Sequence, residues 1–307
     1  MAAAYDRLAE LKAFDETKAG VKGLADAGIT DLPRFFHAPP HLLHGSPAAP
    51  ADDPSYVFPI IDLDGAWEDP DKRNRIVGEI REASANWGFF HVVNHGVPAR
   101  VVDEMKAGAH RAPNPPEPEQ LPTCCREIVT EFSKEMLNLG DVLFQLLSEA
   151  LGLRSNHLKE IGCLEGMDTA YNYYPVCPEP ELTLGATQHT DTGFITVLAQ
   201  DDIGGLQVLH RNRWVDVPPM SQGLVVNLGT LLQHRVVLKG AEPRVSAISF
   251  FGIGYTLNTR LYGPVEELLS EDNPPKYKKT TIKDLVAHAY KQGLDGTSFL
   301  HHLKLMD

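Results

Sequence analysis

The spacing of apolar residues divides the chain into a helical first half and a strand-rich second half. Leu8, Leu11 and Phe14 recur at three-residue spacing, which predicts a helix over residues 5–19. Further predicted elements are a strand at 59–63, a helix at 71–86, a buried strand at 89–94 and helices at 98–109 and 119–151. The last helix carries one continuous apolar stripe, which predicts that it packs against a sheet.

After residue 168 the pattern changes to short apolar runs that are separated by turn signals. Eight strands are predicted, at 169–174, 182–189, 194–200, 206–209, 214–217, 224–227, 234–238 and 244–251. So many short strands in so short a stretch predict a double-stranded β-helix, or jelly roll. The expected fold class is therefore mainly β with flanking helices, a jelly-roll core that follows an N-terminal α/β region. We expect an N-terminal helical and strand region at 1–111, backing helices at 112–166 and the jelly-roll domain with a C-terminal helix at 167–307.

Two histidines and an aspartate stand out among these strands. His189 and Asp191 are two residues apart, so on a strand their side chains point to the same face. His234 opens a later run and shares its face with Leu232. With 13 histidines in the chain, about one His-x-Asp triplet is expected by chance, so the triplet alone is weak. Together the three residues match a two-histidine, one-carboxylate facial triad, which suits Fe(II) and also accommodates Mn(II) or Co(II).

An arginine on the last predicted strand needs an anionic partner. Arg244, Ser246, Ile248 and Phe250 share one face of this strand, and the strand carries no acidic residue. An unpaired buried charge costs several kcal/mol. The guanidinium therefore pairs either with a distant Asp or Glu or with a dicarboxylate cosubstrate, to which the Ser246 hydroxyl adds a hydrogen bond.

Composition and charge exclude several classes of protein. The net charge of -13 argues against a nucleic-acid partner, because phosphate backbones require a basic surface. No apolar run is long enough to span a membrane, and charged residues occupy the N-terminus where a signal peptide needs an apolar core. The four cysteines fit neither a zinc pattern nor a disulfide framework. We expect a cytoplasmic monomer that acts on a small organic substrate and binds neither nucleic acid nor membrane.

Six longer segments carry a resemblance to one family. They are Phe58–Leu63, Trp87–Phe90, Asn94–Pro98, Asn172–Pro175, Gly204–Val208 and Trp214–Val217. In these segments and in the three candidate ligands the chain resembles the plant iron(II)- and 2-oxoglutarate-dependent dioxygenases. Within that family it is similar to the 1-aminocyclopropane-1-carboxylate oxidase homologues, including DIBOA-glucoside dioxygenase-like members. Because the segments are spread over most of the chain, the resemblance is specific.

The resemblance implies a set of site residues and a reaction. The implied metal ligands are His189, Asp191 and His234, with no catalytic side chain beyond them. The implied cosubstrate-binding residues are Arg244 and Ser246 at the distal carboxylate of 2-oxoglutarate, and Asn172 and Tyr174 at its other end. Such enzymes use Fe(II) and O2, convert 2-oxoglutarate to succinate and most often hydroxylate a small specialised plant metabolite. Ascorbate is the alternative cosubstrate, as in the ethylene-forming relatives, although the Asn-Tyr-Tyr-Pro segment favours 2-oxoglutarate.

The substrate and the residues that select it are unknown from the sequence. The resemblance places pocket residues on scattered loops and around Leu285–Leu294. Met167, Phe194 and Phe251 fit either the pocket wall or the core.

Two segments are shorter than in the resembling family. Before His234 about ten residues are missing, and losing a loop of that size is mild whereas losing a strand is not. After Met105 roughly forty to fifty residues are missing, which by resemblance removes sheet strands and leaves an exposed edge. Three interpretations follow: an active natural variant, a catalytically impaired paralogue that binds iron or a small ligand, and a gene model with skipped exon sequence.

Overall fold

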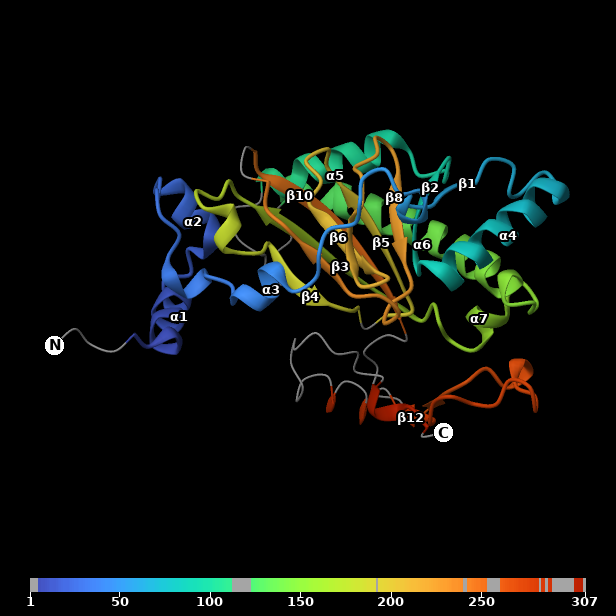
Figure 1. Ribbon diagram of the computed structural model, residues 1–307. Coiled ribbons are helices and arrows are strands. Elements are labelled where there is room, and N and C mark those ends of the chain that lie inside the picture. Colours follow the sequence, from blue (N-terminus) through green and yellow to red (C-terminus); the bar gives the residue numbers. More distant parts are fainter. Residues whose placement is uncertain are drawn as a thin grey trace.

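Two β-sheets lie face to face, and helices cover the outer face of the larger sheet (Figure 1). The computed structural model describes residues 5–111, 123–191, 193–239, 242–252, 260–281, 283–284, 287–288 and 301–305. The larger sheet has the strand order β1-β2-β8-β5-β10-β3 and the smaller one β4-β9-β6-β7, while β11 and β12 form a separate pair. The strands are β1 (Ile60–Asp62), β2 (Phe89–Val93), β3 (Gly166–Tyr174), β4 (Ala186–His189), β5 (Ile195–Gln200), β6 (Leu206–His210), β7 (Arg213–Asp216), β8 (Leu224–Asn227), β9 (His234–Val236), β10 (Arg244–Gly252), β11 (Leu261–Tyr262) and β12 (Thr280–Thr281).

The eight strands from β3 to β10 divide between the two sheets in the manner of a jelly roll. Strands β3, β5, β8 and β10 lie in the larger sheet, and β4, β6, β7 and β9 form the smaller one. Their pairings are antiparallel, whereas β1 and β2, which extend the larger sheet, pair in parallel. The predicted fold class, a jelly-roll core after an N-terminal α/β region, is confirmed.

The helices predicted before the jelly roll are present, and short helical turns occupy the connector between the first helix and the first strand. Most of the region of the predicted C-terminal helix lies outside the described residues. The helices are α1 (Arg7–Glu16), α2 (Gly20–Asp26), η1 (Arg34–Phe36), α3 (Pro40–His44), η2 (Pro54–Tyr56), α4 (Pro70–Asn86), α5 (Ala99–Arg111), α6 (Thr123–Ala150), α7 (His157–Glu160), η3 (Pro180–Leu182), η4 (Glu266–Leu268) and η5 (His301–Leu303). Helix α4 begins where Asp69 accepts hydrogen bonds from the backbone N–H groups of Asp71 and Lys72, with Pro70 in the first turn. No helix in the described ranges is both long and apolar enough to cross a membrane.

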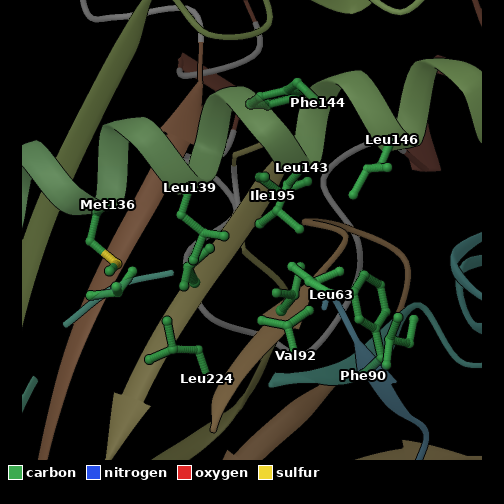
Figure 2. Packing of buried hydrophobic residues seen from close by; sticks show 14 of the residues in the cluster. Leu63, Phe90, Val92, Met136, Leu139, Leu143, Phe144, Leu146, Ile195 and Leu224 are labelled. Atoms are coloured by element: carbon green, nitrogen blue, oxygen red, sulfur yellow. The ribbon is translucent and has the colours of Figure 1, made fainter. Parts of the chain in front are cut away.

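Helix α6 packs its apolar stripe against the larger sheet, as the sequence predicts. Figure 2 shows Met136, Leu139 and Leu143 of this helix directed toward Ile195 of β5 and Leu224 of β8. These side chains are buried, and each fully buried Leu, Ile or Met side chain contributes about 1.5–3 kcal/mol to folding. The helix therefore fixes the sheet whose other face carries part of the functional site.

A second apolar cluster fills the space between the two sheets. Phe89, Leu198 and Val225 of the larger sheet pack with Val208 and Val236 of the smaller sheet. The cluster packs the two sheets against each other, so polar side chains that point into this layer have fixed surroundings.

All eight jelly-roll strands are present in the described residues, and β3 lies at one edge of the larger sheet. Six residues, 228–233, join β8 to β9, and β9 is present, so the missing part before His234 belongs to a loop and not to a strand. At the other shortened segment, residues 112–122 lie outside the described ranges. In the described part of the chain β3 pairs with β10 alone, and its residues are half-buried or exposed along the whole strand. The exposed edge that is expected from the shortening after Met105 stays a prediction.

Candidate active site

Two imidazoles and one carboxylate converge on the smaller sheet. His189 ends β4, His234 begins β9, and the strand register places them opposite each other with ring centroids 4.2 Å apart. Asp191 Oδ1 lies 3.8 Å from His189 Nε2 and 3.5 Å from His234 Nε2. One ligand atom of each residue lies within 4.8 Å of the others. The structure thus brings together the three residues that the sequence singles out.

A hydrogen bond orients the ring of His189, and burial affects the charge of His234. His189 Nδ1 lies 2.7 Å from the carbonyl oxygen of Thr187, and because a carbonyl only accepts, Nδ1 carries the proton. Nε2 is therefore the ring nitrogen of His189 that is left to face a metal, as in other histidine ligands whose second nitrogen donates to a carbonyl. Burial lowers the pKa of His234, against the opposing charge of Asp191, so this imidazole is neutral at pH 7.

The carboxylate of Asp191 has one oxygen engaged and the other free. Its Oδ2 accepts hydrogen bonds from Thr196 Oγ1 at 2.7 Å and from Asn227 Nδ2 at 2.9 Å. Thr196 and Asn227 are opposite each other on β5 and β8, and Phe89, opposite Asn227 on β2, packs against the His234 ring at 5.4 Å. This row of the larger sheet orients two of the three ligands and leaves Oδ1 available to a metal.

The donor set fits Fe(II). Two imidazole nitrogens and one carboxylate oxygen that lie within 4.8 Å of one another match the ligand set of the facial triad in non-haem iron sites. The same donors accommodate Mn(II) and Co(II), which makes these ions useful substitutes in binding experiments.

The backbone around Asp191 is held by the short connection between β8 and β9. Asp191 follows β4 instead of continuing it, and its N–H donates to the carbonyl oxygen of Gly229 at 3.1 Å. The N–H of Gly229 donates to the carbonyl oxygen of Phe194, also at 3.1 Å. A Cβ atom on Gly229 would lie 1.8 Å from the carbonyl oxygen of Gly193, so only glycine allows this approach. The position of Asp191 therefore depends on these backbone contacts and not on the strand alternation that the sequence suggests.

A second polar cluster spans three strands of the larger sheet. Arg244 on β10 is opposite Tyr174 on β3, and Ser246 is opposite both Asn172 on β3 and Gln200 on β5. The Arg244 side chain is buried, and its guanidinium lies over the Tyr174 ring at 5.2 Å. The four predicted cosubstrate-binding residues thus occupy two adjacent cross-strand rows.

In the described part of the chain, the hydrogen bonds of the Arg244 guanidinium go to neutral acceptors. Nε donates to the carbonyl oxygen of Gly204 at 2.7 Å, Nη2 to Gln200 Oε1 at 3.0 Å and Nη1 to Ser246 Oγ at 3.3 Å. Burial lowers the pKa of Arg244, but a guanidinium stays protonated at physiological pH. A salt bridge from Arg244 to a distant carboxylate is not found among these residues, so the cation is available to an anionic ligand.

Other candidate residues have structural positions. The ring of His95 is a structural hydrogen-bonding group: its Nε2 lies 3.0 Å from the carbonyl oxygen of Gln222 and its Nδ1 accepts from the N–H of Val97. Phe251 is fully buried in the core against α6, and Met167 packs partly buried on the same core. Most of the predicted pocket segment 285–294 lies outside the described ranges.

Three residues at the site escape the sequence analysis, namely Thr196, Asn227 and Gln200. The sequence does hold a signal for these residues, since each is a polar residue within or at the end of a short apolar run. In the structure these runs form β5 and β8, which are buried at every position. A polar side chain in a fully buried strand needs a partner, and here the partners are Asp191 and Arg244.

A jelly roll that brings two histidines and one carboxylate together beside its smaller sheet is typical of the mononuclear non-haem iron oxygenases. Residues 166–253 match the 2OG-Fe(II) oxygenase superfamily, and residues 58–121 match the N-terminal region of the non-haem dioxygenases in morphine synthesis. A 1-aminocyclopropane-1-carboxylate oxidase homolog of Solanum lycopersicum is 43% identical over 359 positions, covering 98% of each chain. Homolog 1 of Arabidopsis thaliana is 44% identical, over 99% of this chain and 98% of the relative. The chain therefore belongs to the 2OG-Fe(II) oxygenase superfamily, among the 1-aminocyclopropane-1-carboxylate oxidase homologues, and is an Fe(II)- and 2-oxoglutarate-dependent enzyme.

The solved structure of JOX2 in complex with 2OG, Fe and JA is similar over nearly the whole chain. Its TM-score is 0.77 at 27% sequence identity, with 93% of this chain and 97% of JOX2 covered. The alignment to the tomato relative has 359 positions whereas this chain has 307 residues, so more than fifty positions of that relative have no counterpart here. This difference agrees in size with the two shortened segments taken together.

Proposed function

We propose that this enzyme oxidises a small, mostly apolar specialised plant metabolite, most often by hydroxylation, and that His189, Asp191 and His234 hold the Fe(II). The observation that carries the proposal is the approach of three ligand atoms to within 4.8 Å, with Asp191 Oδ1 left free by its hydrogen bonds. When bound, Fe(II) with O2 and 2-oxoglutarate supplies the oxidising chemistry, and 2-oxoglutarate leaves as succinate and carbon dioxide.

In this proposal the residues on β3 and β10 bind 2-oxoglutarate. Arg244 and Ser246 take the distal carboxylate, because within the described residues the hydrogen bonds of the buried guanidinium go to neutral acceptors. Tyr174 lies beside Arg244, so we assign it to the same end of the cosubstrate and not to the other end that the resemblance implies. Asn172 lies opposite Ser246 in the next cross-strand row, and we assign it to the remaining part of the 2-oxoglutarate molecule.

Three observations support a small apolar substrate. The surroundings of the ligands are apolar on one side, where the Phe89 ring lies 5.4 Å from the ring of His234. JOX2, which shares the fold and 27% of the sequence, holds JA together with 2OG and Fe. The net charge of -13 opposes a nucleic-acid substrate.

An anaerobic titration tests the proposal. Fe(II) plus 2-oxoglutarate should give a visible charge-transfer band in the purified protein, and the band should be absent from an Arg244→Ala variant at the same 2-oxoglutarate concentration. With O2 and without ascorbate, the protein should release succinate above the level of a His189→Ala variant. Folded protein that gives no band and no succinate would overturn the proposal and favour an impaired paralogue. Oxidation of substrate that requires ascorbate in place of 2-oxoglutarate would favour an oxidase of the ethylene-forming type.

A further inference from the structure

Gln200, the last residue of β5, has a buried donor that finds no partner in the described part of the chain. The residue is 6% exposed, and its Oε1 accepts a hydrogen bond from Arg244 Nη2 at 3.0 Å. Its Nε2 has no hydrogen-bond partner among the described residues. A buried amide N–H that stays unpaired costs about 1–3 kcal/mol, so Nε2 needs a partner from outside the described residues, either a water molecule or a ligand.

The orientation of the Gln200 amide is fixed by Arg244. A guanidinium has donors and no acceptor, so it bonds only to the oxygen of the amide. Turning the amide over would place two donors against each other and lose the hydrogen bond to Arg244. The free Nε2 is therefore a donor that stands next to the guanidinium, in the row that Gln200 forms with Ser246 and Asn172.

The other side chains around Arg244 also have donors to offer. Ser246 Oγ accepts from Arg244, so its own proton is free to donate. Burial raises the pKa of the Tyr174 phenol, which therefore keeps its proton. Asp201, the carboxylate whose charge acts on Arg244, accepts two backbone N–H groups. A cluster of donors around a buried cation, with its nearby carboxylate already engaged, fits a carboxylate ligand.

We propose that Gln200 is a further ligand of the distal carboxylate of 2-oxoglutarate, donating from Nε2 while its Oε1 orients the Arg244 guanidinium. The inference rests on the proposed function, because it requires the Arg244 cluster to be the cosubstrate site. It also explains why the position carries a neutral amide: a carboxylate there would pair with Arg244 and repel the dicarboxylate.

Two chelating probes separate this role from a general effect on the metal site. Oxalate and N-oxalylglycine both chelate a metal through their oxalyl group, but only N-oxalylglycine extends to a distal carboxylate. Binding of each probe to Co(II)-loaded protein is measured by calorimetry. Gln200→Leu should lower the affinity for N-oxalylglycine about ten- to a hundredfold, as expected for losing a hydrogen bond to a charged group. The affinity for oxalate should change by no more than about twofold. Gln200→Glu, which is nearly isosteric, should weaken N-oxalylglycine at least as much.

A matched substitution controls for the loss of a glutamine. Gln145 on α6 is half-buried and donates to Asp141, and Gln145→Leu should change the affinity for neither probe. Thermal unfolding of each variant confirms that it is folded. The role of Gln200 is overturned if the folded variants Gln200→Leu and Gln200→Glu bind N-oxalylglycine as tightly as the wild type does. It is also overturned if their affinity for oxalate falls by the same factor as their affinity for N-oxalylglycine. If the wild type binds neither probe, the proposed function itself fails, and the role of Gln200 fails with it.

Discussion

Asn227 Nδ2 donates to Asp191 Oδ2 at 2.9 Å, although the two residues are 36 positions apart. Thr196 occupies the same oxygen, so Asp191 Oδ1 is the atom that faces both histidines. A carboxylate held in this way binds a metal through one oxygen and keeps further coordination positions open. Open positions are what a facial triad provides for cosubstrate and oxygen.

Replacing Asn227 with leucine should weaken metal binding. The leucine keeps the volume of the side chain but leaves Asp191 Oδ2 with one donor, and loss of such an orienting contact lowers metal affinity about 10- to 100-fold. Titration with Co(II), followed by its visible absorption, measures the change. Asn156→Leu serves as control, because Asn156 is exposed and makes no capping hydrogen bond at α7. Equal affinities of the wild type and Asn227→Leu would show that Asp191 needs no orientation from β8.

Arg244→Lys should raise the KM for 2-oxoglutarate and leave kcat nearly unchanged. Lysine retains the charge but cannot donate at once to Gly204, Gln200 and Ser246, as the guanidinium does. We expect KM to rise about 10- to 100-fold, the effect of losing a hydrogen bond to a charged group. Steady-state kinetics over a range of 2-oxoglutarate concentrations separates the two constants. Arg213→Lys, at an arginine that donates to Ala48, is the control. A fall in kcat at constant KM would contradict a cosubstrate-binding role.

Gly229→Ala should destabilise the protein and weaken its metal site together. The added Cβ would meet the carbonyl oxygen of Gly193 at 1.8 Å, so the backbone that bonds to the N–H of Asp191 must move. We expect a loss of roughly 2–4 kcal/mol in the free energy of unfolding, at the upper end of single-substitution effects. Urea unfolding and Co(II) titration measure the two consequences.

Gly78→Ala is the matched control for this substitution. Gly78 lies on the exposed face of α4, where a Cβ meets nothing within 4 Å, so alanine should stabilise by about 0.5–1 kcal/mol through its helix propensity. If Gly229→Ala is as stable as the wild type, the connection from 228 to 233 adapts without disturbing Asp191, and its tight approach to Gly193 has no role.

The fold and the outline of the site follow from local patterns in the sequence. Short apolar runs with turn residues between them predict the eight jelly-roll strands. His189, Asp191 and His234 stand out because such polar residues rarely belong on inward faces. Arg244 and Ser246 are found in the same way, since two-residue spacing places them on one face of a strand.

The supporting residues depend on register, which the sequence does not reveal. Asn227 contacts Asp191 only because β8 lies between β2 and β5, and Gln200 reaches Arg244 only because β5 pairs with β10. These pairings join segments far apart in the chain, so no local periodicity reports them. The sequence predicts the orientation of Asp191 from strand alternation alone. In the structure its backbone is held by a hydrogen bond to Gly229, a contact between distant segments that local periodicity does not report.

The stability of the metal-free protein should fall as the pH decreases from 7.5 to 5.5, and His95 should account for part of the fall. Burial lowers the pKa of His95 below its ordinary value of 6.5, and burial does the same for His91 and His210. Below pH 6.5 the unfolded chain therefore binds protons that the folded protein does not, so the stability present above that pH is progressively lost. Each such histidine contributes at most about 1.4 kcal/mol per pH unit to the slope.

His95→Asn tests this contribution, because asparagine does not titrate and its Oδ1 replaces Nδ1 as the acceptor for the N–H of Val97. Urea unfolding at several pH values should give a shallower slope for this variant than for the wild type, by up to about 1.4 kcal/mol per pH unit. The slope of His41→Asn, at an exposed histidine, should equal that of the wild type. Parallel profiles for the wild type and His95→Asn would mean that His95 takes up no extra proton on unfolding, and that the acid sensitivity arises at other histidines.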